Sequence, residues 1–350
     1  SDNTLKSGFT LAPVNTVEIN SALIDALATG NQNEGGSFKL MTSVLPISSD
    51  VKVTNADASG ITFESVSGKT YKIDLNTTLV ESSTGNASGK YAIVNSTTAV
   101  GTVDAKTVLI ATEGTPLLTV TADMVIKSMY VMEGARLTLS GAETLAVTES
   151  IRNDGTLEVV NKLECENIVN NGTMDATNAA AAFTVTGGEG EIVLTAPNAG
   201  NNIKVIGDAK QQVIYETSDD IADVIANATR MPVVNAIRTT AASSLTIENW
   251  KSLGNIKNVI LNGDIALTFS EDGEYNLNGI TITVSESKTV TLAGQGLSTS
   301  VKGVTLNVAK NATINLSDIE VSGVAEGEGT IIADGYDETW NGSKSPVDKD

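Results

Sequence analysis

The chain has 350 residues, enough for two domains, and its 22 basic and 42 acidic side chains give a formal net charge of −20. This charge repels polyanions, and with aromatic residues at only 4% it argues against nucleic acid as a partner. Histidine is absent and Cys165 is the single cysteine, so an internal disulfide and a Ser-His-Asp arrangement are both excluded. Short runs of Val, Ile, Leu and Ala between Ser, Thr, Asn and Gly are typical of an all-β fold, and none is long enough to span a membrane.

The first 16 residues are mostly polar and are interpreted as an extended leader. The start Ser-Asp-Asn resembles the residues that follow the lipidated cysteine of bacterial surface lipoproteins. That resemblance implies a lipid anchor before Ser1 and a place on the cell surface, at the bacterial outer membrane. An arbitrary chain boundary is the alternative.

The next segment predicts a short amphipathic helix, because apolar residues between Val17 and Leu27 recur at helical spacing and Gly30 can end it. A glycine turn and a predicted strand at residues 37–41 follow. Helix, glycine turn and first strand resemble the N-terminal cap of pectate-lyase-like right-handed parallel β-helix proteins. The resemblance implies a β-helix, or β-solenoid, whose first coil is covered by a cap.

Short strands separated by polar turns are predicted at residues 51–53, 61–63, 70–75, 91–94 and 107–110. They show no clean period, so the coil register of residues 40–120 is not defined. The region is interpreted as solenoid coils, with a separate β-sandwich as the alternative.

From residue 132 the pattern predicts coils of three short strands. Residues 153–157 and 170–174 match at an offset of 17, which favours stacking of equivalent strands over hairpins between adjacent ones. Asn153 and Asn170 are then expected to form an inward asparagine ladder that caps turn backbones.

The pattern changes near residues 207–218. An acidic first turn and apolar residues at helical spacing predict a second helix over residues 218–228, which Pro232 follows. Residues 245–253 fit a strand or a short helical connection. Because helix followed by strands occurs twice, we predict a first β-helix unit at 17–207, a second at 208–335 and a cap or tail at 336–350. One continuous solenoid with a helical insertion is the alternative, and tandem β-sandwiches are the alternative fold.

The strongest repeat lies in the second unit. Residues 279–284 return as 303–308, and residues 289–292 return as 313–316, both at an offset of 24. A fixed offset that preserves two separate β-type runs indicates one coil of a parallel β-solenoid.

Candidate catalytic groups are sparse. β-helix lyases that resemble this fold hold calcium with clustered acids and use an Arg or Lys base. Here Glu133, Asp154 and Asp175 are spaced 21 residues apart near Arg136 and Arg152, without a local cluster. They are interpreted as solvated turn residues.

The other acidic stretches have simpler interpretations. Residues 216–223 fit a helix N-terminus, and residues 270–274 fit a turn that could hold calcium. Cys165 is expected to be a small buried apolar residue. No metal, cofactor or catalytic residue is predicted.

Three aromatic residues are the candidate ligand contacts. Tyr336 and Trp340 form a pair near the end that could contact a sugar or a protein, or pack in a C-terminal cap. Trp250 is expected to pack between the units.

Three functions remain open. The first is a non-enzymatic surface or secreted protein, adhesin-like or structural, with a lateral face of stacked Thr, Asn and Ser as its contact surface. The second is a glycan-binding module. The third is a polysaccharide lyase or hydrolase of the β-helix type, which needs paired carboxylates on one face. The partners expected are host or microbial glycans or surface proteins.

Overall fold

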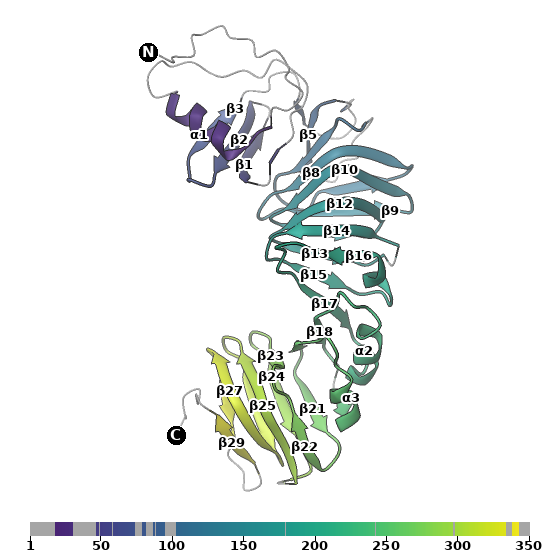
Figure 1. Ribbon diagram of the computed structural model, residues 1–350, viewed down its shortest axis with the longest axis vertical. Coiled ribbons are helices and arrows are strands. Elements are labelled where there is room, and N and C mark those ends of the chain that lie inside the picture. The colour runs from purple at the N-terminus through teal and green to yellow at the C-terminus, as the bar shows by residue number, and fades with distance from the viewer. Residues whose placement is uncertain are drawn as a thin grey trace. The chain divides into compact units, whose positions relative to one another are not determined.

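The computed structural model describes residues 18–30, 47–48, 50–57, 59–73, 79–81, 87, 89–94, 103–178, 180–241, 243–296, 298–333 and 338–342. The chain forms two compact units, one of residues 1–191 and 202–211 and the other of residues 192–201 and 212–350 (Figure 1). The unit bounds predicted from the sequence stay a prediction. The predicted leader, the strand at 37–41 and Tyr336 lie outside the described residues.

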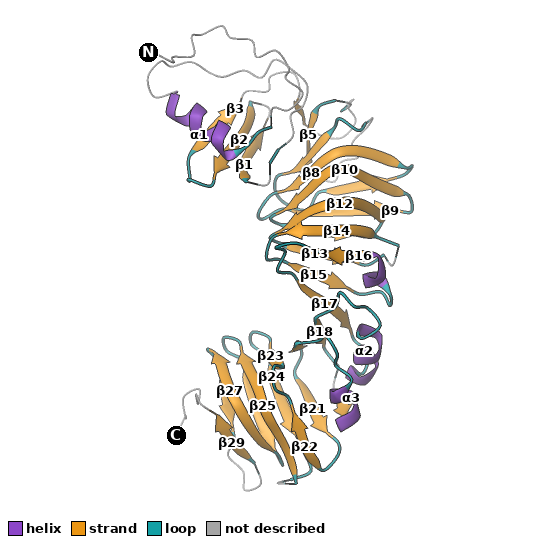
Figure 2. Ribbon diagram, in the orientation of Figure 1, coloured by secondary structure: helices purple, strands orange, loops and turns teal. Residues whose placement is uncertain are grey.

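Nearly all regular structure is β, and parallel strands stack into a β-solenoid of about twelve turns over the described residues (Figure 2). This confirms the predicted fold class. Tandem β-sandwiches, the alternative, would instead have been built from antiparallel sheets. No helix among the described residues is long and apolar enough to cross a membrane.

The first unit contains two stacks of parallel strands. One is an eight-stranded sheet in the order β16-β14-β12-β10-β8-β6-β5-β4, and the other follows the order β13-β11-β9-β7. The first stack consists of β4 (Leu79–Glu81), β5 (Tyr91–Val94), β6 (Val108–Ala111), β8 (Met124–Val131), β10 (Thr144–Asn153), β12 (Lys162–Asn170), β14 (Ala182–Gly187) and β16 (Ile203–Val205). The second consists of β7 (Leu117–Val120), β9 (Arg136–Gly141), β11 (Thr156–Val159) and β13 (Thr173–Ala176).

The coils predicted from residue 132 onward are confirmed. Asn153 lies opposite Asn170, and Leu157 lies opposite Met174, in parallel register at the predicted offset. The first two runs of each coil join into one strand, and the pairing shifts after Val147, where β10 passes from one run to the next. Because side chains alternate across each strand, aliphatic residues fill the interior and polar ones face outward.

The predicted asparagine ladder is also present. Both asparagines are fully buried, and Asn153 Nδ2 donates to Asn170 Oδ1 at 2.8 Å. Asn170 Nδ2 donates to the Glu191 carbonyl at 3.0 Å and to Gln211 Oε1 at 2.7 Å. Gln211 extends the ladder by one member that the sequence pattern did not predict. These bonds satisfy the amide nitrogens of both asparagines, which would otherwise be costly to bury.

The N-terminal part of the first unit corrects the predicted coils. Strands β1 (Val51–Asp57), β2 (Gly60–Ser65) and β3 (Thr70–Ile73) form an antiparallel sheet, so these three strands are not solenoid coils. The short turn between β2 and β3, with Gly68 at φ +77°, suits a hairpin and is too short for a parallel crossover. The predicted helix is α1 (Ser21–Gly30), which packs on β2 and β3.

This N-terminal element, α1 with β1–β3, covers a lateral face of the solenoid. Its apolar residues, such as Ile24 and Phe63, share one buried cluster with Tyr91, Ile110 and Tyr130. Those three side chains project from the outer side of β5, β6 and β8, since their neighbours along each strand face the interior. The element therefore gives these strands a second buried face.

The second unit continues the solenoid pattern. One sheet follows the order β29-β27-β25-β23-β20-β18-β17-β15, the other follows β19-β21-β24-β26-β28, and β22 pairs with β25. The first consists of β15 (Glu191–Leu194), β17 (Gln212–Thr217), β18 (Ala236–Thr239), β20 (Asn258–Leu261), β23 (Thr281–Val284), β25 (Thr299–Val308), β27 (Glu320–Gly327) and β29 (Thr339–Gly342), with η1 (Ala199–Asn202) following β15. The second consists of β19 (Ser243–Leu245), β21 (Ile265–Phe269), β24 (Thr289–Ala293), β26 (Thr313–Ser317) and β28 (Thr330–Ile332), and β22 is Gly273–Asn276.

The 24-residue repeat stacks as predicted. Ile282 pairs with Leu306, and Val290 pairs with Ile314, each in parallel register. The second helix is α2 (Ile221–Ala228), whose N-cap Asp220 accepts from the Ala222 backbone N–H at 3.0 Å. The ambiguous stretch 245–253 holds the end of β19 and α3 (Ile247–Lys251), which a capping box begins.

Candidate binding groove

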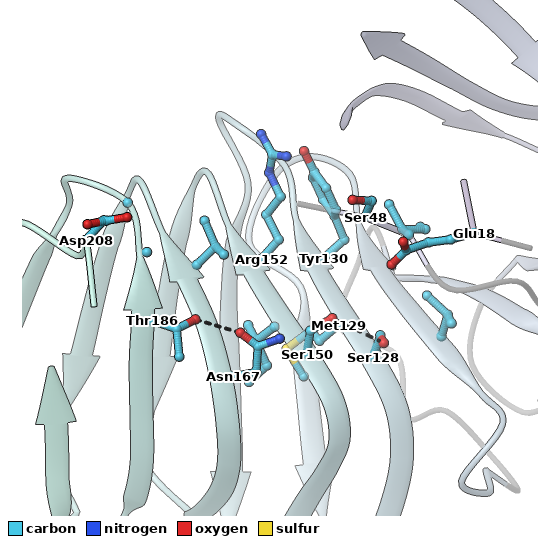
Figure 3. Close-up of a pocket in the computed structure, with 16 residues that line it drawn as sticks. Glu18, Ser48, Ser128, Met129, Tyr130, Ser150, Arg152, Asn167, Thr186 and Asp208 are labelled. Atoms are coloured by element: carbon cyan, nitrogen blue, oxygen red, sulfur yellow. Dashed lines mark hydrogen bonds between the residues drawn. The ribbon is translucent and has the colours of Figure 1, made fainter. Parts of the chain in front are cut away.

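A groove of about 470 Å³ lies on the outer side of the eight-stranded sheet in the first unit (Figure 3). Its floor is built from side chains of successive strands β6, β8, β10, β12 and β14. Its volume is within the range of small-ligand sites. The lining residues are Glu18, Ile47, Ser48, Val108, Ser128, Met129, Tyr130, Ser150, Ile151, Arg152, Asn167, Val169, Thr186, Gly187, Gly188 and Asp208.

A row of hydroxyl and amide side chains crosses the floor, one from each of β8, β10, β12 and β14. Ser128 pairs with Ser150 in register, and their hydroxyl oxygens are 3.5 Å apart. On the next two strands the Thr186 hydroxyl donates to Asn167 Oδ1 at 2.6 Å (Figure 3). Parallel stacking repeats the row at the strand spacing of about 4.8 Å. We call Ser128, Ser150, Asn167 and Thr186 the polar row.

Beside the polar row, Tyr130, Arg152 and Asp154 form a cluster. The Tyr130 hydroxyl donates to Asp154 Oδ2 at 2.5 Å, and Arg152 Nε donates to the same oxygen at 2.9 Å. The guanidinium carbon lies 5.4 Å from the centre of the Tyr130 ring. The Asp154 side chain is only 8% exposed, so the ion pair is largely withdrawn from water.

The cluster also holds the N-terminal element. The Val53 backbone N–H donates to the Tyr130 hydroxyl at 3.0 Å, and Arg152 Nη1 donates to the Val51 carbonyl. Burial, reinforced by the Asp154 carboxylate, raises the pKa of Tyr130 well above its ordinary value. These contacts bind the edge of β1 to β8 and β10, so the cluster has a structural role.

Five charged residues were compared above with the catalytic site of β-helix lyases, and the structure shows which of them lie together: Glu133, Arg136, Arg152, Asp154 and Asp175. Arg136 lies 3.8 Å from Asp175, on the outer side of β9, β11 and β13. Arg152 pairs with Asp154 in the other sheet, and Glu133 binds Lys52 at 2.7 Å. These five residues therefore do not form one cluster.

The other acidic stretches make local contacts. Glu216 pairs with Arg238 at 2.9 Å, and Asp220 caps α2. Glu271 accepts from the Ile247 backbone N–H at 2.8 Å, and Glu274 pairs with Lys302 at 2.7 Å. Among the described residues no group of three or more acidic or cysteine side chains could hold a metal ion.

The two candidate tryptophans, Trp250 and Trp340, are not among the residues that line the groove. Trp250 is 6% exposed and stacks on Phe269 at 5.7 Å between ring centres, and Tyr275 meets Phe269 edge-on at 4.9 Å. Trp340 is half-buried on β29, opposite Val321. Trp250 thus packs in a core, and a ligand role for either tryptophan stays a prediction.

Cys165 is buried at 4% exposure in β12. Burial, more than any other influence, raises the pKa of its thiol to about 11. At neutral pH the thiol is protonated, as expected for a small buried apolar residue.

The groove was not predicted from the sequence. Its polar row comes from four strands, and Glu18, Ile47 and Ser48 line it from a distant part of the chain. One signal was available: residues 91–94 and 108–111 are apolar without alternation, which indicates strands buried on both faces.

No protein-family model, curated protein or solved structure matches this chain. Its function must therefore be inferred from the fold and from the chemistry of the groove.

Proposed function

We propose that the protein is a non-enzymatic surface or secreted β-solenoid protein of the adhesin-like or structural kind, which binds partners on its lateral faces. We also propose that the protein is related to pectate-lyase-like β-helices and that it is a lipid-anchored bacterial surface protein. Its expected partners are glycans or surface proteins.

One observation supports binding over catalysis: the charged groups of the groove do not converge. Glu18 and Asp208 line opposite ends, and Arg152 between them is engaged by Asp154 and by the Val51 carbonyl (Figure 3). Glycoside hydrolysis needs two carboxylates facing one bond, and calcium-dependent elimination needs clustered acids. Hydroxyl and amide groups suit recognition instead.

A second candidate, a glycan-binding module, is favoured by the polar row. A lyase or hydrolase is the third, and turnover separates it from the other two. The full chain would be incubated with neutral and acidic polysaccharides while bound polymer and newly formed reducing or unsaturated ends are both measured. We expect retention of an intact polymer or of a surface protein; release of ends that scales with protein concentration would contradict the proposal.

The surface location has its own test. A precursor carrying its natural upstream segment would be expressed in a bacterial host with a labelled fatty acid, and intact cells would be treated with protease. We expect label in the protein and digestion from outside. An unlabelled protein that is shielded from protease would contradict the anchored-surface proposal.

A further inference from the structure

The polar row of the groove has unused hydrogen-bonding capacity. Each hydroxyl offers one donor and two acceptor positions, and the Asn167 amide offers both donors and an acceptor. The contacts at 3.5 Å and 2.6 Å link the row in two pairs and use only part of this capacity. The row thus presents the Ser150, Asn167 and Thr186 side chains on three neighbouring strands, while Ser128 is buried at 5% exposure.

Charge determines which ligand suits this row. The formal charges among the described residues that line the groove are Glu18, Arg152 and Asp208, and the single cation is engaged by Asp154. The two acids at the ends, and a chain with net charge −20, repel an anionic polymer. Among these described lining residues no further cation offsets this repulsion, so an uncharged ligand is favoured.

The floor beside the polar row is low and partly apolar. Val169 lies next to Gly187, and at Gly188 a Cβ atom would lie 2.1 Å from the Asn170 carbonyl oxygen. A larger residue is therefore excluded at Gly188, which also has φ +89°. This leaves a smooth strip where the C–H face of a sugar ring can rest while its hydroxyls meet the polar row.

We infer that the groove binds a neutral, hydroxyl-rich glycan chain that lies across strands β8 to β14, with the polar row as its hydrogen-bonding floor. This inference rests on the proposed function of a binding protein, and it names the ligand class and the residues. A hexose ring is about as long as one strand spacing, so a chain in this direction can place successive rings over successive strands.

The test uses the full chain and a series of neutral hexose oligosaccharides, from disaccharides to longer chains, with oligo-uronic acids of equal length beside them. Binding would be measured by calorimetry at low and high salt. We expect affinity for the neutral series to rise with length until the row is covered and then to level off. Salt should change it little, because screening acts on charges.

Paired variants locate the site. Asn167→Ala/Thr186→Ala removes half of the polar row and should weaken binding about tenfold, as expected for two lost hydrogen bonds. The control Thr291→Ala/Asn315→Ala changes the same residue types, which are in register on the outer side of β24 and β26 in the second unit. It should bind like the unchanged chain.

Three outcomes overturn the inference while leaving a binding function possible: preference for uronic acids, no binding of any neutral oligosaccharide, or equal loss in both double variants. Cleavage of the oligosaccharides would overturn the proposed function itself. Circular dichroism of each variant verifies that folding is kept.

Discussion

The coils around β11 and β13 in the first unit and the 24-residue coils of the second unit achieve the same parallel stacking with different residues. In the first, Asn153 and Asn170 stack inside, and Gly172 lies where successive coils touch. In the second, Ile282 and Leu306 stack as fully buried aliphatic residues. The first unit also stacks buried apolar residues, Leu157 on Met174, so its side-chain hydrogen bonds add to packing, whereas this stack of the second unit relies on packing.

The two units share one kind of coil contact at glycine and differ in their other turn residues. A Cβ atom on Gly172 would lie 1.9 Å from the Gly155 carbonyl oxygen, so the coils of the first unit need glycine there. The coils of the second unit have the same close approach at Gly323, where a Cβ atom would lie 1.9 Å from the Val304 carbonyl oxygen. They also place Ser287 and Asn311 at φ of +59° and +60°, which side chains rarely adopt. In both units, the contacts between successive coils therefore determine which residues the sequence needs.

The largest effect is expected for Gly172→Ala. The added methyl overlaps the backbone of the preceding coil, so we expect a loss of roughly 3–5 kcal/mol in the free energy of unfolding. Denaturant unfolding followed by circular dichroism measures it. Gly187→Ala is the matched control, since its Cβ would meet only the Val169 side chain at 3.5 Å; an equal loss there would refute the coil-contact explanation.

The next effect is expected for Asn170→Leu. The change removes the hydrogen bonds that the Asn170 amide makes with Asn153, with Gln211 and with the Glu191 carbonyl, which should cost about 2–4 kcal/mol. The reverse exchange, Leu306→Asn, buries an amide among aliphatic residues in the second unit and should cost a similar amount. If Asn170→Leu stabilised the protein in thermal unfolding, the ladder would not be what holds this register.

Alkaline pH should weaken the first unit through Cys165. Its pKa is raised from 9.0 to about 11 by burial, so the unfolded chain releases the proton first. The stabilisation that comes from keeping this thiol neutral is complete below pH 9 and is lost as pH rises from 9 to about 11. The total loss in the free energy of unfolding is about 2–3 kcal/mol. In the Cys165→Ala variant the free energy of unfolding should fall less steeply between pH 9 and about 11. An unchanged dependence on pH would show that other groups cause the loss.

The smallest effect is expected for Ser287→Gly in the second unit. Relief of the left-handed backbone at φ +59° should outweigh the added freedom of the unfolded chain, for a gain of about 0.5–1 kcal/mol. Ser285→Gly, outside the left-handed region, should lose stability instead. The same sign for both variants in denaturant unfolding would contradict this explanation.

Stacking was predictable from the sequence wherever the chain repeats itself. The matches at offsets of 17 and 24 placed Asn170 beside Asn153 and Leu306 beside Ile282, because equivalent residues of successive coils must face the same way. Asp220 and the acidic turn likewise located α2.

The N-terminal element and the groove were not predictable, because they depend on contacts between distant segments. Val53 binds Tyr130 across 77 residues of chain, and no periodicity encodes such a contact. Gln211 joined the ladder from outside the repeated segments for the same reason. Local patterns determine the coils, and tertiary packing determines what covers them.

The most direct test of parallel stacking uses spin labels in a Cys165→Ala background. One double variant, Thr283→Cys/Asn307→Cys, labels residues that lie opposite each other on β23 and β25. The other, Thr283→Cys/Thr291→Cys, labels successive runs that a hairpin would bring together. Stacked coils predict strong dipolar broadening for the first pair, at one strand spacing, and weak broadening for the second. The reverse pattern would show that neighbouring runs pair as hairpins, and the solenoid would be wrong.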